Sequence, residues 1–152
     1  MLTLDTPQDF ARHIGQTLGP TDWRSVPQSQ ISEFAGLTGD DHWIHVDEAR
    51  AAQQAPGGRT IVHGLFLLSL IPEWQRQLFQ ITHRGAGLLY GYDKVRFVAP
   101  VAVDTPIRLG QRVSDVTAHA KGTRISLTCT IEVETPGRVA AIAEAILLIA
   151  PA

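Results

Sequence analysis

The sequence predicts an α+β fold in which an antiparallel sheet curves around one buried helix. Apolar residues recur at helical spacing in the first half of the chain of 152 residues, and from Gly87 onward their period falls to two. Helices followed by strands are typical of α+β folds rather than of βαβ alternation. Between the two halves, the segment Leu65–Ile71 is apolar on every face, which suits a helix that the rest of the protein covers.

The N-terminal third predicts two helices separated by a short strand. We expect the first helix over Thr6–Leu18, because proline at position 7 suits a first helical turn. A strand is expected over Trp23–Val26, and Ser29 is expected to cap the second helix. The Gly39-Asp40-Asp41 sequence should end that helix. Its apolar stripe would be formed by Ile31, Phe34 and Leu37.

Two further helices precede the sheet. The pattern over Val46–Gln54 predicts a helix capped by Asp47, followed by a loop at Ala55–Gly58. The longest helix is predicted from Val62 to Phe79, with its second half amphipathic. Pro72 lacks a backbone N–H, so we expect it to kink this helix.

Four strands are predicted after the long helix, over Leu88–Val98, Thr105–Thr117, Thr123–Glu134 and Arg138–Ile149. Turn residues at Lys121-Gly122 and at Thr135-Pro136-Gly137-Arg138 predict antiparallel hairpins. In the third strand, apolar side chains alternate with polar ones, which predicts a sheet with one solvated face. A sheet of this kind wrapped around a helix is the hot-dog architecture. The predicted core face of that strand consists of Ile125, Leu127, Cys129, Ile131 and Val133.

Length and composition predict a single domain over residues 1–152. A net charge of −2 with scattered arginines argues against nucleic-acid binding. No apolar run approaches the length of about 20 residues that a membrane helix needs, and we recognise no signal peptide. The single Cys129 is interpreted as a core residue, and the absence of disulfides favours a cytoplasmic protein.

The candidate catalytic pair is Asp40 and His45, in the sequence TGDDHWIHV. A carboxylate and a neutral imidazole can hold one water molecule from two sides and remove its proton. Gly39 permits an irregular backbone, so the two side chains can converge. The alternative is that Asp40 only ends a helix and that His45 packs against Trp43. Spacing alone slightly favours this alternative.

A metal site is the second alternative for this segment. It would combine Asp40, Asp41, His42 and His45, but it lacks the motifs typical of zinc sites, so we predict no metal. Asp41 and His42 are otherwise interpreted as turn residues.

The dipeptide His63-Gly64 stands at the predicted start of the buried helix. Its free N–H groups and the helix dipole suit an oxyanion, so Gly64 is the candidate donor to a thioester enolate. The alternative is that Gly64 only permits tight packing. His63 is interpreted as a structural residue that bonds a neighbouring loop. Ser69 is interpreted as bonding the backbone four residues back rather than contacting the site. Trp43, Trp74, Tyr90 and Tyr92 are candidates for an acyl pocket, although packing is the more common role.

Two segments together resemble the MaoC-like dehydratase family, which includes the (R)-specific enoyl-CoA hydratases. They are FAGLTGDDHWIHVD from Phe34 to Asp47 and TIVHGL from Thr60 to Leu65, and GDDHWIHVD resembles the NodN-like branch. A third segment, Tyr92–Val101, resembles the strand that follows the central helix in that family. The resemblance covers roughly residues 30 to 110.

The resemblance implies a hot-dog homodimer that hydrates trans-2-enoyl thioesters to (R)-3-hydroxyacyl thioesters, or the reverse. It implies that Asp40 and His45 are catalytic, that the Gly64 amide is the oxyanion donor, and that the substrate is carried on coenzyme A or acyl carrier protein. No further cofactor is expected. His63, Trp43, His42 and Ser69 are tentative substrate-binding residues. The alternatives are a hot-dog thioesterase and a non-catalytic subunit that binds acyl thioesters.

Two departures from the family pattern are evident. His42-Trp43 stands where the commoner motif has Asn-Pro, and Pro72 stands where the better-known hydratases have a serine that supports the catalytic aspartate. The sequence therefore leaves open which group supports Asp40.

Overall fold

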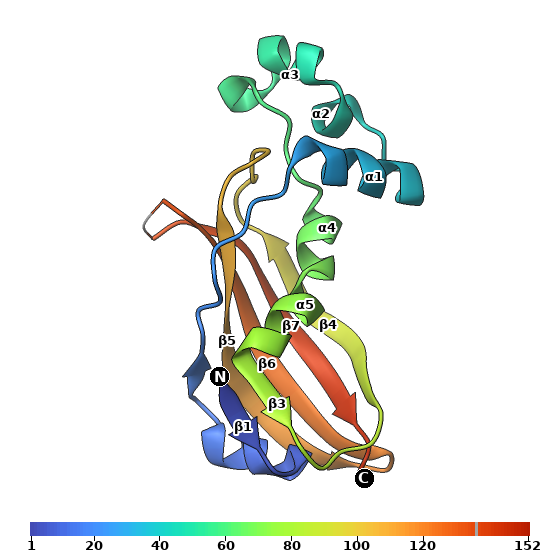
Figure 1. Cartoon of the computed structure of the whole chain (residues 1–152), viewed down its shortest axis with the longest axis vertical. Helices are drawn as coiled ribbons and strands as arrows, with labels where there is room; N and C mark the ends of the chain where they lie inside the picture. The colour runs from blue at the N-terminus through green and yellow to red at the C-terminus, as the bar shows by residue number, and fades with distance from the viewer. Residues whose placement is uncertain (136) are drawn as a thin grey trace.

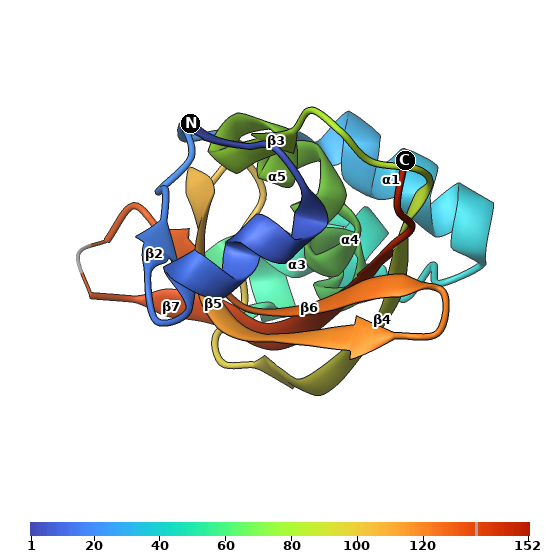
Figure 2. The same cartoon turned by 90° about the horizontal axis from the view of Figure 1, so that it is seen from below.

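The computed structural model describes residues 1–135 and 137–152 and shows one five-stranded antiparallel sheet with a helix across its concave face. Figure 2 shows the sheet curving around this helix, as the hot-dog fold requires. The strand order is β2-β5-β6-β7-β4, so β4 and the short β2 form the two edges. The strands are β2 (Thr17–Leu18), β4 (Gly87–Phe97), β5 (Ile107–His119), β6 (Gly122–Val133) and β7 (Val139–Ile149).

The four long strands confirm the predicted ones, with ends that agree to within two residues. On β6 the predicted core face is buried throughout, and Cys129 is a buried core residue as expected. The β5–β6 and β6–β7 pairs are antiparallel, as the turn residues predicted. In the second turn, Pro136 lies outside the described residues.

The central helix is two helices, α4 (Gly64–Ser69) and α5 (Ile71–Leu78), so the prediction of one helix from Val62 to Phe79 was wrong. The two meet at Leu70, and Pro72 lies in the first turn of α5. Pro72 has no N–H to offer the Leu68 carbonyl four residues earlier. That carbonyl accepts a hydrogen bond of 3.1 Å from the Tyr92 hydroxyl on β4 instead.

Burial of α4 is one-sided, contrary to the expectation from its apolar sequence. Leu67 and Leu68 are buried against the sheet, whereas Leu65 is 64% exposed. The apolar run therefore predicts where this helix lies in the sequence, but it does not predict which face of the helix is buried. In the described part of the chain, no helix has both the length and the apolarity needed to span a membrane.

The N-terminal region differs from the prediction of a helix over Thr6–Leu18. A 3-10 helix, η1 (Pro7–His13), is followed by the strand β2, which pairs with β5. A two-stranded parallel sheet that the sequence analysis missed joins β1 (Leu2–Leu4) to β3 (Phe79–Ile81). The expected strand over Trp23–Val26 is only an isolated bridge from Arg24 to Ile107.

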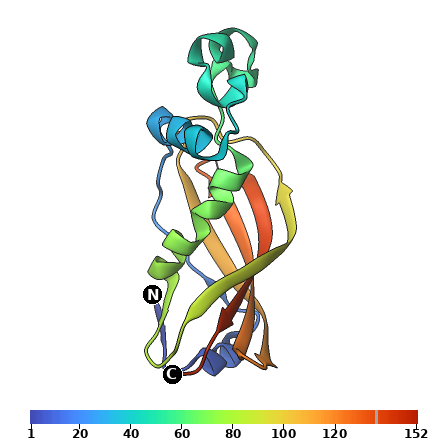
Figure 3. The same cartoon turned by 90° about the vertical axis from the view of Figure 1, so that its right-hand side faces the viewer.

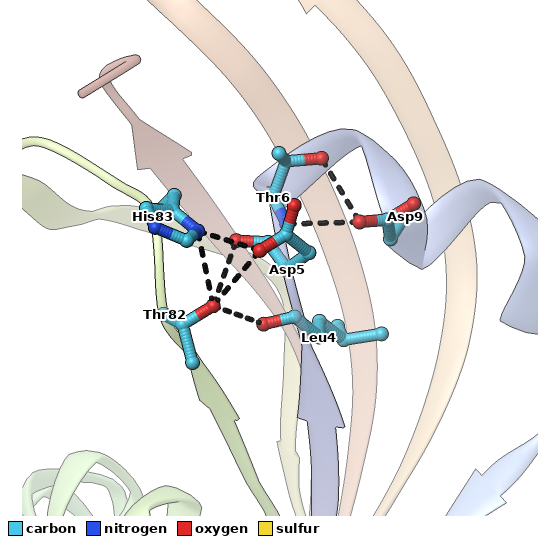
Figure 4. A network of polar contacts seen from close by, with 6 residues as sticks. All are labelled: Leu4, Asp5, Thr6, Asp9, Thr82 and His83. Atoms are coloured by element: carbon cyan, nitrogen blue, oxygen red, sulfur yellow. Dashed lines mark hydrogen bonds and ion pairs between the residues drawn. The ribbon is translucent and has the colours of Figure 1, made fainter.

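A polar network ties β1 to the segment after β3 at the end of the molecule that carries both termini (Figure 4). The Asp5 carboxylate accepts hydrogen bonds from the His83 imidazole at 2.5 Å and from the Thr82 hydroxyl at 3.1 Å. Both bonds lower the pKa of Asp5, and the bond from His83 has the larger effect. Because Asp5 and His83 are both mostly exposed, the network orders the chain more than it adds stability.

The remaining helices gather beyond one end of the sheet, as Figures 1 and 3 show. They are α1 (Gln28–Thr38), α2 (Trp43–Val46), α3 (Glu48–Gln54) and the short 3-10 turn η2 (Pro56–Gly58).

Several details of these helices correct the sequence analysis. The cap of α1 is Pro27 rather than Ser29, and Leu37 is 86% exposed instead of belonging to the buried stripe. The helix expected over Val46–Gln54 begins only after Asp47, which caps α3 as predicted by accepting from the Arg50 N–H at 2.9 Å.

Candidate active site

Three side chains from separate elements converge above the end of the sheet. Asp40 follows α1, His45 lies in α2, and His63 directly precedes α4. One polar atom from each of the three lies within 4.8 Å of those from the other two. The chain therefore brings together the two residues of the predicted pair and adds a third.

Asp40 owes its place to the way α1 ends. Gly39 adopts a left-handed conformation with φ of 78°, and its N–H bonds the Ala35 carbonyl at 2.8 Å. Glycine adopts this conformation without the strain that a Cβ would bring. The chain therefore turns away from the helix axis, and Asp40 remains exposed, with its N–H 3.3 Å from the Thr38 hydroxyl.

The hydrogen bonding of His45 sets its tautomer. Its Nδ1 lies 2.7 Å from the Ile61 carbonyl oxygen, which can only accept, so Nδ1 carries the proton. In the neutral ring Nε2 then bears a free lone pair. Burial lowers the pKa of His45, and the neighbouring His63 lowers it further, against the opposing effect of the bond to Ile61. The environment thus favours a neutral imidazole that can accept a proton at Nε2.

Gln28, at the start of α1, holds the backbone around His45. Its side-chain N–H donates to the His45 carbonyl at 2.7 Å, and its carbonyl accepts from the Thr60 hydroxyl at 2.5 Å. The Ile61 N–H also donates to the Ile44 carbonyl at 3.0 Å. These bonds join α1, α2 and the strand-like segment before α4 into one unit.

His63 is buried, with 2% of its surface exposed. Its Nε2 lies 2.8 Å from the Asp40 carbonyl oxygen, which confirms the predicted bond to a neighbouring loop. Its ring stacks on that of His45, with 3.8 Å between centroids, and the centroid of the Phe34 ring lies 4.9 Å away. Its Nδ1 is buried without a hydrogen-bond partner in the described chain. The ring of His45 therefore stacks on His63 and not on Trp43, the partner that the alternative gave it.

Gly64 begins α4, and the ring of Phe97 from β4 covers it. A Cβ at position 64 would lie 2.7 Å from Phe97 Cζ, so a larger residue would require the Phe97 ring to shift. This contact bears out the tight packing weighed as the alternative role for Gly64. Its N–H makes no hydrogen bond in the described residues and remains available as a donor.

The other candidate residues have local partners. His42 accepts from the Ile44 N–H at 3.4 Å, as a turn residue would, and the Trp43 ring lies 4.4 Å from the Arg50 guanidinium carbon. The Ser69 hydroxyl donates to the Phe66 carbonyl at 2.7 Å, three residues back instead of the predicted four. None of these contacts places His42, Trp43 or Ser69 against the pair formed by Asp40 and His45.

The group Asp40, His45 and His63 is small enough to surround one water molecule. A carboxylate and imidazoles are also metal-ligand types. However, this group is not the metal-ligand set that the sequence analysis considered, because it lacks Asp41 and His42.

A groove with a volume of about 560 Å³ lies elsewhere. It runs between α5, β3 and the first residues of β4, at the opposite end of α4–α5 from His63. None of the clustered side chains lines it.

Sequence reasoning missed three residues of this site. Phe97 looked like an ordinary strand residue, although it lies within a segment that resembles the family. Gln28 and Phe34 looked like helix residues, and nothing in their spacing indicated that they contact His45 and His63.

Comparison with known proteins identifies the family of the chain. The family model described as MaoC like domain matches residues 9–135. The chain is 37% identical over 148 residues to 3-hydroxyacyl-thioester dehydratase Z of Mycobacterium tuberculosis, covering 97% of each chain. It is 36% identical over 145 residues to Nodulation protein N of Rhizobium leguminosarum bv. viciae, covering 93% of this chain and 89% of that protein.

A solved structure shows the same fold. The (R)-hydratase from A. caviae involved in PHA biosynthesis superposes with a TM-score of 0.70 at 25% identity, covering 88% of this chain and 94% of that one. The hot-dog fold predicted from the sequence is therefore confirmed.

Proposed function

The chain belongs to the MaoC-like dehydratase family, and we propose that it is a hydro-lyase that interconverts trans-2-enoyl thioesters and (R)-3-hydroxyacyl thioesters. The names of its relatives, a 3-hydroxyacyl-thioester dehydratase and an (R)-hydratase, support this reaction class. The observation that carries the proposal is the convergence of the Asp40 carboxylate with a His45 ring whose Nδ1 is already bonded.

In the proposed hydration, Asp40 and His45 hold one water molecule between them. The water oxygen attacks C3 of the enoyl thioester while the dyad accepts the water proton. The dyad then returns a proton to C2 on the same face, which completes a syn addition. Dehydration follows the same steps in reverse.

The Gly64 N–H is the proposed donor to the thioester oxygen, on which negative charge develops as C3 is attacked. It stands at the N-terminus of α4, where N–H groups lack partners within the helix. The proposed reaction uses no metal, flavin or nicotinamide, and coenzyme A or acyl carrier protein serves as the handle of the substrate.

Crotonyl-CoA tests the proposal directly. We expect the wild-type protein to consume its enoyl absorbance and to form the (R)-3-hydroxy product. Asp40→Asn should lose activity by at least about 100-fold, because the amide cannot accept the proton. Asp41→Asn is the matched control, since Asp41 is an exposed neighbour outside the cluster, and it should retain activity. Full activity in Asp40→Asn, or release of free thiol without hydration, would refute the proposal.

We further propose that residues 1–152 form one domain that assembles as a homodimer through β4. This strand is an edge of the sheet, so its outer N–H and C=O groups are free to pair with a second copy. It also exposes large apolar side chains, which single soluble chains seldom gather on one strand. These are Leu88, Leu89, Tyr90 and Phe97.

A further inference from the structure

We infer that His63 is the positioning residue of the catalytic dyad: its Nε2–H fixes the backbone of Asp40 while its ring supports the imidazole of His45. This inference rests on the proposed hydratase function. It assigns His63 to the dyad rather than to substrate binding, because a ring that is 2% exposed offers almost no surface to a substrate.

Asp40 depends on His63 because its own segment is weakly held. The chain between the end of α1 at Thr38 and the start of α2 at Trp43 forms no regular element. In the described residues, the Asp40 N–H bonds only the nearby Thr38 hydroxyl. The bond of 2.8 Å from His63 Nε2 is the contact that ties this segment to a distant part of the chain, 23 residues away.

His63 also supports the other member of the dyad. Its ring lies against His45 with 3.8 Å between centroids and an angle of 23° between planes. Because the Ile61 carbonyl holds His45 Nδ1, the stack restrains the remaining freedom of the ring to tilt. One side chain thus contacts both dyad residues, which aligns acid and base relative to each other.

The anchor itself is rigid. The His63 carbonyl accepts the Leu67 N–H at 3.1 Å in the first turn of α4, and the Phe34 ring packs against the His63 ring at an angle of 50°. The unpartnered Nδ1 is the informative detail. A buried histidine retained for structure alone is expected to satisfy both nitrogens, whereas this ring uses only its Nε2–H and its face.

Two variants separate the contributions of the N–H and the ring. His63→Phe keeps a flat ring of similar size but removes the donor, whereas His63→Gln keeps an N–H donor that can reach the Asp40 carbonyl but removes the ring. With crotonyl-CoA we expect His63→Phe to lower kcat by about 100-fold, as small misplacements of catalytic groups do. KM should stay within about threefold, since substrate contacts are unchanged. His63→Gln should recover part of kcat, to within about tenfold of wild type.

The control is Phe10→Leu, which disturbs a fully buried residue at the opposite end of the molecule. It should lower the melting temperature without lowering kcat at temperatures where the protein is folded. An inactive wild type would refute the hydratase function itself. Suppose instead that the wild type is active. A kcat of His63→Phe within twofold of the wild-type value, or a kcat of His63→Gln as low as that of His63→Phe, would then overturn the positioning role of His63 and leave the hydratase function standing.

Wild-type protein provides the test if the variants do not fold. Nitrogen-15 NMR of the histidine rings should show His63 as the Nε2–H tautomer and His45 as the Nδ1–H tautomer. A His63 ring protonated only on Nδ1 would overturn the inference, because it could not donate to the Asp40 carbonyl.

Discussion

At the residue scale, Gly64 combines two roles that a substitution can separate. Gly64→Ala keeps the backbone N–H but places a Cβ 2.7 Å from Phe97 Cζ. We expect this overpacking to lower the free energy of unfolding by about 1–3 kcal/mol and to reduce hydration of crotonyl-CoA.

Removing the obstruction should reverse both effects. In Gly64→Ala with Phe97→Ala, the ring is gone while the N–H remains, so stability and activity should recover together. Chemical denaturation and the crotonyl-CoA assay measure the two quantities. Recovery of stability without recovery of activity would show that Phe97 itself contributes to the site.

The protonation of His45 predicts the pH dependence of the reaction. The base must be neutral, and burial lowers the pKa of His45 below its ordinary value of 6.5. On acidification, kcat/KM should therefore fall to half its maximum at a lower pH than an unperturbed histidine would give. A pH–rate profile, with NMR titration of the His45 ring, makes the measurement. A midpoint at or above pH 6.5 would contradict the assignment.

At the element scale, Gln28 joins α1 to α2 and to the segment before α4. Gln28→Leu leaves the His45 carbonyl and the Thr60 hydroxyl without their partner. We expect a loss of about 1–3 kcal/mol in unfolding free energy, because partly buried polar groups become unsatisfied. The activity should fall as well, since His45 loses a backbone anchor.

Gln53→Leu on the exposed surface of α3 is the matched control for this prediction. It makes the same chemical change where no partner is lost, so its stability and kcat should match wild type. Equal behaviour of the two variants would show that the Gln28 bonds do not hold α2.

The strands were predictable from sequence because their alternation of apolar and polar residues reflects burial on one face. Helix ends were less predictable. At the break between α4 and α5, Tyr92 supplies a donor to the Leu68 carbonyl where Pro72 cannot, and that pairing joins distant positions. Likewise, β1 and β3 are too short to show a period, and they exist because residues 2–4 and 79–81 meet.

The residues of the site show the same difference between local patterns and contacts that join distant positions. The proposed roles of Asp40, His45 and Gly64 come from the family resemblance, and residue types and spacing alone were only compatible with them. The support for Asp40 could not be inferred from the sequence, because it comes from a His63 bond that spans 23 residues. Packing of Phe97 over Gly64 likewise depends on how β4 lies against α4.

At the scale of the whole molecule, the exposed edge of β4 predicts the assembly. Tyr90 and Leu88 are 66% and 63% exposed. Wild-type protein should be a dimer by light scattering, and Tyr90→Lys combined with Leu88→Lys should yield monomers, because burying two lysines against their copies is costly. Ile14→Lys, at an exposed apolar residue away from β4, should leave the dimer intact. A monomeric wild type would contradict the proposal.

The helices α1–α3 stand beyond the end of the sheet, and Asp40 and His45 both belong to that cap. The acid and the base thus lie in one stretch of the chain, whereas His63 and Gly64 belong to the start of α4. Replacing residues 28–61 with those of a relative should transplant that relative's acid and base onto an unchanged sheet and central helix, provided that His63 is kept. Diversification of such enzymes can then proceed by exchanging caps.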